Sequence, residues 1–206
     1  MTMIQGATSA TAATTAASGS ASTVKVWDPL VRIFHWSLAL AFATAFIVED
    51  DLLAVHVWAG YLALALIGIR LIWGLIGPRH ARFSDFVRGP SRVVGYLRDA
   101  MQFRAKRYLG HNPAAGAMVV TLLFMVSATG ISGMALYGAE ELSGPLAPLL
   151  SGLGPAWGQG LEEVHEVFAN LTLALIGVHV LGVLFSSLSH QENLVRAMFD
   201  GRKRVD

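Results

Sequence analysis

The sequence predicts an all-α integral membrane protein: a four-helix bundle with a basic cytoplasmic loop that carries a short interfacial helix. Three observations predict this fold class. Of the 206 residues, 54% are hydrophobic and only 14% are charged, and the mean hydropathy of +0.54 is too high for an ordinary soluble domain. Four apolar runs are each long enough to cross a bilayer. Most of the arginines gather in one segment between the second and third runs.

The chain divides into a polar tail and one membrane domain. Residues 1–23 are mostly Ala, Thr, Ser and Gly and lack the basic and apolar regions of a signal peptide, so we expect a disordered tail followed by a domain over 24–206. Asp28 suits a helix N-cap and Pro29 a first helical turn. The first two membrane helices are therefore expected at about 30–48 and 52–76.

The segment 79–111 is the most basic part of the chain. Apolar residues recur at helical spacing from Val93 to Met101, opposite charged residues, which predicts a short helix on the membrane surface. The same charges would fit a nucleic-acid patch. Between two spanning segments they are better explained as topology determinants, so no nucleic-acid partner is expected.

The second half of the chain contains two more apolar runs. Asn112 and Pro113 open the third helix, expected at about 114–137, and a Gly/Pro-rich connection over 138–160 leads to the fourth, expected at about 164–188. A polar, basic tail follows. The glycines of the third run are interpreted as sites of close helix packing: Gly116, Gly130 and Gly133.

The charges predict the orientation in the membrane. With four spans, both termini and the segment 79–111 share one side, and all fifteen Lys and Arg residues lie there or at the adjacent helix ends. In the short turn 49–51 and the connection 138–160, all the charged residues are acidic. By the positive-inside rule, both termini are expected in the cytoplasm of a bacterial cell, with the protein in the inner membrane.

Four histidines sort by depth into two pairs. His165 and His179 are fourteen residues apart on the fourth helix, which puts them about 40° apart in projection and about 21 Å apart along the axis. His35 lies at the depth of His179, and His56 at the depth of His165. Two bis-histidine haems stacked across the membrane require this arrangement, and cysteine, which would hold other metal centres, is absent.

Other residues near these histidines suggest how a haem would be held. Arg70 and Arg32 lie at the depth of the cytoplasmic-side pair and could bind haem propionates. For Arg32, snorkelling to the lipid headgroups is an equal alternative. Gly60 is one turn from His56, where a missing side chain would let a macrocycle approach. A lone histidine in a membrane helix is more often a packed polar residue, but four that agree in depth favour ligation. Surface or interfacial roles are expected for the remaining histidines: His80, His111 and His190.

Several motifs carry a resemblance to a known family. They are Phe34-His35-Trp36, His56 with Gly60 and Arg70, His165-Glu166-x5-Thr172-x6-His179, Glu192–Met198 and Gly201–Arg204. Over about residues 24–204 the chain resembles the bacterial cytochrome b561 family, which includes the di-haem cytochrome b subunits of Ni,Fe-hydrogenases. The resemblance implies that His35 and His179 hold a cytoplasmic-side haem b, and His56 and His165 a periplasmic-side haem b.

The expected function is electron transfer across the inner membrane. Bis-histidine ligation leaves no open iron position, so substrate chemistry at the metal is not expected, and an electron-transfer subunit is favoured over a stand-alone enzyme. The resemblance implies exchange between the quinone pool and a periplasmic partner: a c-type cytochrome, a dehydrogenase or a hydrogenase subunit. His111, Asn112 and His190 are candidate quinone residues. Membrane lipid surrounds the bundle, and a homodimer is left open.

Two rival functions come from other classes. One is a self-sufficient superoxide:quinone oxidoreductase, which the acidic outer side disfavours because it would repel an anionic substrate. The other is a haem-free membrane anchor subunit. Turnover of superoxide by the isolated protein would support the first, and the absence of a Soret band the second.

Overall fold

Four long helices form the body of the molecule. The computed structural model describes residues 22–49, 51–150 and 152–205, so the tail expected at 1–23 falls almost wholly outside the described residues. The long helices are α1 (Pro29–Val48), α2 (Leu53–Ile76), α5 (Pro113–Glu140) and α7 (Pro155–Ser189). All four are long and apolar enough to cross a membrane, which confirms the predicted fold class.

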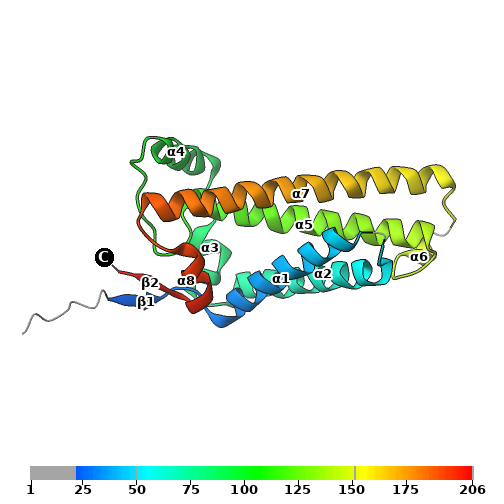
Figure 1. Cartoon of the computed structure of the whole chain (residues 1–206), viewed down its shortest axis with the longest axis horizontal. Coiled ribbons are helices and arrows are strands. Elements are labelled where there is room, and N and C mark those ends of the chain that lie inside the picture. The colour runs from blue at the N-terminus through cyan, green and yellow to red at the C-terminus, as the bar shows by residue number, and fades with distance from the viewer. Residues whose placement is uncertain (1–21, 50, 151, 206) are drawn as a thin grey trace, which may run out of the picture.

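The four helices pack as two antiparallel hairpins. α1 lies beside α2, and α5 lies beside α7, with α2 and α5 joining the two pairs (Figure 1). A small core joins α1, α2 and α5: Phe34, Ala41, Ala63, Ile67, Leu123 and Val126. Most large apolar side chains instead point outward, as Leu40 and Leu75 do with 70% and 73% of their surface exposed. An outward apolar surface of this extent suits contact with lipid.

The beginnings of α1 and α5 follow the predicted capping pattern. The carboxylate of Asp28 accepts a hydrogen bond from the backbone N–H of Val31 at 3.2 Å, and the side chain of Asn112 accepts one from Ala115 at 2.8 Å. A proline follows each cap at the first helical position, where its missing N–H leaves no helical hydrogen bond unmade.

α7 begins nine residues earlier than the expected position 164, at Pro155. The Gly/Pro-rich composition favoured a loop there, but Pro155 starts the helix and Gly158 lets it pack closely on α5. A Cβ at Gly158 would lie 2.7 Å from a carboxylate oxygen of Glu140. The connection between α5 and α7 is therefore shorter than predicted and contains one short helix, α6 (Ala147–Leu150).

One end of the bundle, which we call the basic end, holds most of the short elements and both ends of the described chain (Figure 1). Between α2 and α5 come a 3-10 turn, η1 (Arg79–Ala81), and two helices, α3 (Phe83–Phe86) and α4 (Pro90–Met101). No residue of α4 is buried, and its apolar side chains are open, with Met101 75% exposed. This is the amphipathic helix that the sequence predicted for the membrane surface. The opposite end, where α1 ends, α2 begins and α6 lies, is called the acidic end.

The C-terminal segment predicted as a tail folds back onto the N-terminal segment. α8 (Leu194–Asp200) leads into strand β2 (Arg202–Arg204), which pairs antiparallel with strand β1 (Thr23–Lys25). The carbonyl of Gly201 also accepts hydrogen bonds from the N–H groups of Val26 and Trp27, at 2.8 and 3.1 Å. We call β1, β2 and α8 the terminal clasp.

A buried ion pair ties the terminal clasp to the bundle. The carboxylate of Glu192 accepts from Arg107 at 2.9 Å and lies 3.1 Å from the ammonium of Lys203. Lys203 also donates to the carbonyl of Tyr108 at 3.1 Å. Burial alone would raise the pKa of Glu192, but the hydrogen bonds and charges of Arg107 and Lys203 hold that pKa below its usual value. Burial lowers the pKa of Lys203, and Glu192 opposes this shift.

Candidate functional site

The structure brings the four singled-out histidines together as two pairs. At the basic end, the rings of His35 on α1 and His179 on α7 have their centroids 6.3 Å apart, with their planes inclined by 52°. At the acidic end, the rings of His56 on α2 and His165 on α7 are 5.9 Å apart, inclined by 78°. We call these the basic-end pair and the acidic-end pair. All four rings are half-buried between helices.

The spacing within each pair fits a metal held between two axial imidazoles. A bond of about 2 Å from a metal to each ring nitrogen places the two ring centroids about 6 Å apart. Both observed spacings agree with this value. Ligation of iron stays a prediction.

The hydrogen bonds of the acidic-end pair suit metal ligands. The Nδ1 atom of His56 is 3.0 Å from the carbonyl oxygen of Ala45, and that of His165 is 3.0 Å from the carbonyl oxygen of Thr129. A carbonyl can only accept, so each Nδ1 carries the proton and donates it. The lone pair of each ring is then on Nε2, and a histidine ligand is typically oriented in this way.

The basic-end pair has a different environment. The Nδ1 atom of His35 is buried and has no hydrogen-bond partner among the described residues. Its ring meets the neighbouring Trp36 edge-on, with centroids 5.0 Å apart, and Trp36 stacks on Phe199 of α8 at 4.4 Å. A continuous series of aromatic contacts therefore runs from His35 to the terminal clasp.

Arg70 is a buried cation at the basic end. Only 2% of its surface is exposed, and its Nη2 donates to the carbonyl of Ala81 at 3.0 Å. The guanidinium lies over the ring of Phe83, 4.9 Å from its centroid. Its Nη1 is buried and has no partner among the described residues, so one edge of the fork is available to an anionic group.

Arg32 and Gly60 lie on opposite halves of the bundle. The Nη1 of Arg32 donates to the carbonyl of Phe199, so this arginine binds the last turn of α8 to α1, while its buried Nε has no partner within the described ranges. Gly60 is half-buried, yet a Cβ there would meet no heavy atom within 4 Å. There is thus open space beside α2 one turn from His56, where a flat macrocycle was expected to approach.

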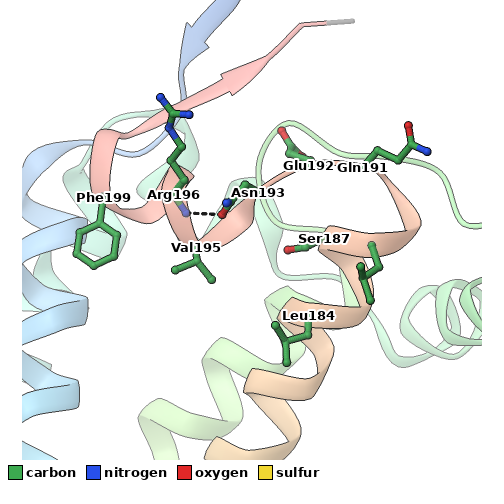
Figure 2. A pocket seen from close by; sticks show the side chains of 9 residues that line it. Leu184, Ser187, Gln191, Glu192, Asn193, Val195, Arg196 and Phe199 are labelled. Carbon is green, nitrogen blue, oxygen red and sulfur yellow. Dashed lines mark hydrogen bonds between the residues drawn. The ribbon is translucent and has the colours of Figure 1, made fainter.

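A groove lies between the end of α7 and α8 (Figure 2). It is a shallow, largely open groove with a volume of about 640 Å³. Its lining combines apolar side chains with polar ones, among them Leu184, Leu188, Val195, Phe199, Gln191 and Arg196. Phe199 therefore lines the groove and also stacks on Trp36, next to His35.

The three candidate quinone residues fall in separate environments. Asn112 caps α5, and His190 ends α7 beside the groove. His111, for which a surface or interfacial role was expected, packs between the rings of Trp27 and Phe86, with centroid distances of 4.6 and 4.5 Å. Burial, followed by the nearby positive charges of the basic end, lowers the pKa of His111 to about 3, so this imidazole is neutral at physiological pH.

Sequence reasoning missed the residues of α5 that contact the acidic-end pair. Besides Thr129, the hydroxyl of Ser132 lies 3.2 Å from Nδ1 of His165. Gly133 was interpreted as a site of close helix packing, and it does pack closely, but on the histidine ring itself. A helix without histidines offered no signal for this role except its small residues.

Comparison with known proteins identifies relatives of the whole membrane domain. A family model described as "Prokaryotic cytochrome b561" matches residues 26–201. Similar proteins include a "Probable Ni/Fe-hydrogenase B-type cytochrome subunit" of Rhodobacter capsulatus, 24% identical over 88% of this chain and 82% of the relative. A protein of the same description from Cupriavidus necator is 26% identical over 85% of both chains. No solved structure matches the chain.

Proposed function

Because the chain belongs to the prokaryotic cytochrome b561 family, we propose that it is a di-haem cytochrome that carries electrons across the membrane between the quinone pool and a periplasmic redox partner. The chain is a bacterial multi-pass membrane protein that uses haem b in electron transfer. The proposal of two haems rests on the two histidine pairs, whose α7 members are fourteen residues apart.

Each pair would hold one haem b through its two imidazoles. When bound, haem b supplies reversible one-electron transfer, and a bis-histidine site leaves no position for a substrate at the iron. The residues of this chain then have three tasks: to ligate, to orient the ligands and to exclude water. α7 supplies one ligand to each site and so fixes the separation of the two centres along the membrane normal, about 21 Å by helix geometry.

Arg70 would bind a propionate of the basic-end haem. Its Nη2 is held by Ala81 and its plane by Phe83, so the guanidinium is rigid, and its unpartnered Nη1 supports the proposal. An arginine fork matches a carboxylate in geometry and charge. Arg32 is a weaker candidate for this role because it already holds the end of α8.

We place the quinone in the groove between α7 and α8. The groove is mixed in polarity, as an isoprenoid quinone with a polar head and an apolar tail requires, and exposed Leu184 and Leu188 continue along α7 into the span. The contacts from Phe199 through Trp36 to His35 support rapid exchange with the basic-end haem. Of the three residues first considered, His190 is the one adjacent in sequence to the groove.

The partner would dock at the acidic end, which we place in the periplasm with both termini in the cytoplasm. The relatives are described as hydrogenase cytochrome subunits, which supports a hydrogenase module as the partner. A dehydrogenase or a c-type cytochrome would meet the same requirement for a soluble one-electron donor or acceptor.

A haem count on the purified protein and on His179→Ala tests the proposal. We expect a reduced-minus-oxidised spectrum of low-spin haem b and a pyridine haemochrome value of two haems per chain. His179→Ala should retain about one haem, because it removes a ligand of the basic-end site alone. Val178→Ala, at the neighbouring outward-facing position with 54% of its surface exposed, is the matched control and should keep both haems. Two haems in His179→Ala would contradict the assignment, and none in the wild type would favour the haem-free anchor.

A further inference from the structure

α5 has no histidine, yet three of its residues contact one side of the His165 ring. The ring's Nδ1 is 3.0 Å from the carbonyl oxygen of Thr129 and 3.2 Å from the hydroxyl of Ser132. Ser132 donates its own proton to the same Thr129 carbonyl at 2.9 Å. The hydroxyl oxygen of Ser132 is thus a second acceptor for the Nδ1 proton.

Gly133 leaves the space that this ring fills. A Cβ at position 133 would lie 2.7 Å from Cε1 of His165, closer than real Cβ atoms approach other groups, and 3.0 Å from Nδ1, which is also a tight contact. Any side chain at 133 therefore requires the imidazole or one of the helices to move. Because glycine has no side chain, it allows the backbone of α5 to lie directly against the His165 ring.

A second contact locks the register between α5 and α7. The hydroxyl of Thr129 donates to the carbonyl of Met125 at 2.9 Å, so at its 3.1 Å contact with Thr172 it accepts the proton of the Thr172 hydroxyl. Thr172 is fully buried and lies seven residues from each of the two α7 histidines. This contact therefore favours one register of α7 on α5, midway between the two sites.

In the basic-end pair, His35 has no equivalent support among the described residues. The Nδ1 of His35 is buried without a hydrogen-bond partner among the described residues. The contrast indicates that the hydrogen bonds around His165 are a property of one site and not a general consequence of helix packing.

We propose that Thr129, Ser132 and Gly133, which we call the α5 cradle, are positioning residues that fix the tautomer and ring plane of His165 and lower the midpoint potential of the acidic-end haem. The inference rests on the proposed function, since it assumes that His165 ligates iron. An acceptor for the Nδ1 proton makes an imidazole more basic, and a more basic ligand stabilises the oxidised iron.

Two matched pairs of variants test the cradle. Ser132→Ala removes the hydroxyl beside His165, whereas Ser127→Ala removes a hydroxyl that donates to the Leu123 carbonyl of its own helix. Gly133→Ala places a methyl against the His165 ring, whereas Gly130→Ala places one against the flexible side chain of Leu64. Haem per chain, the low-spin electron paramagnetic resonance spectrum and a redox titration would be measured for each, with His179→Ala identifying the signal of the acidic-end haem.

The expected results separate the cradle from ordinary packing. Ser132→Ala should keep both haems and raise the potential of the acidic-end haem, with no change in Ser127→Ala. Gly133→Ala should lose the acidic-end haem or shift its resonance, with Gly130→Ala like the wild type. Unchanged potentials and spectra in Ser132→Ala and Gly133→Ala, or equal effects in the controls, would overturn the inference alone. A wild type without haem would instead overturn the proposed function, and the cradle with it.

Discussion

At the scale of single residues, Arg70 shows how a charge is accommodated within an apolar helix. A buried arginine in a membrane span is costly unless its donors are satisfied. Here Ala81 accepts from one nitrogen and Phe83 covers the plane, but Nη1 has no partner in the part of the chain that the structure describes. The free donor at Nη1 suits a residue that binds an anionic group.

We expect Arg70→Ala to lower the midpoint potential of the basic-end haem. Removal of a nearby positive charge favours the oxidised, more positive iron, so that haem becomes harder to reduce. The measurement is a redox titration of the purified variant beside Arg79→Ala, whose side chain is 78% exposed and serves as the control. If the potential is the same in Arg70→Ala and the wild type, Arg70 does not act on the haem.

At the scale of elements, the terminal clasp joins parts of the chain that are distant in sequence. β1 and β2 are separated by the whole membrane domain, and each is only three residues long, so neither would be stable alone. The buried ion pair of Glu192 and Lys203, with Arg107, holds them to the bundle. The clasp also carries Phe199 to Trp36 and so completes the groove.

Glu192→Gln should destabilise the protein by about 3 kcal/mol, because it leaves the buried Lys203 without its counter-charge. The pKa of Glu192 is below its usual value of 4.5, so its stabilising effect is present above that pH and is lost as the pH falls further. Thermal unfolding in detergent should therefore show a gap between wild type and variant that is widest near pH 7 and narrows below about pH 4.5.

Arg196→Ala is the control for the clasp, because its ion pair with Asp200 is on the surface, with 79% of the arginine side chain exposed. Such pairs contribute about 0–1 kcal/mol, so little change is expected. Equal melting temperatures for Glu192→Gln and the wild type at pH 7 would show that the ion pair does not hold the clasp.

At the scale of the whole molecule, the two ends differ in charge. The clasp, η1, α3 and α4 bring the lysines and arginines to the basic end, while the acidic end carries Glu49, Glu140 and Glu141 near its surface. This asymmetry predicts the orientation in the membrane. It also disfavours superoxide as a substrate at the acidic end, since like charges repel.

The absence of cysteine makes the orientation directly measurable. Gly152→Cys at the acidic end and Gly89→Cys at the basic end occupy exposed positions where a Cβ meets no heavy atom within 4 Å. A membrane-impermeant maleimide should label Gly152→Cys in spheroplasts, and Gly89→Cys only after permeabilisation. The cysteine-free parent controls for background labelling, and the reverse pattern would place both termini in the periplasm.

The sequence by itself determined the four spans, the capping of α1 and α5, and the meeting of the histidines in pairs. These depend on local hydropathy, on Asp and Asn before proline, and on a spacing of fourteen residues along one rigid helix, all of which are read along the chain. The family resemblance, which the comparison confirmed, rests on the same residues.

Only the tertiary structure decided the α5 cradle, the early start of α7, the terminal clasp and the groove. Ser132 and Thr129 reach His165 across more than thirty residues of sequence, and β1 meets β2 across almost the whole chain. Such contacts depend on how helices rotate and pack against one another, and hydropathy and periodicity do not encode this. The sequence therefore predicted which residues would bind haem, and the packing of α5 and α8 decided what surrounds them.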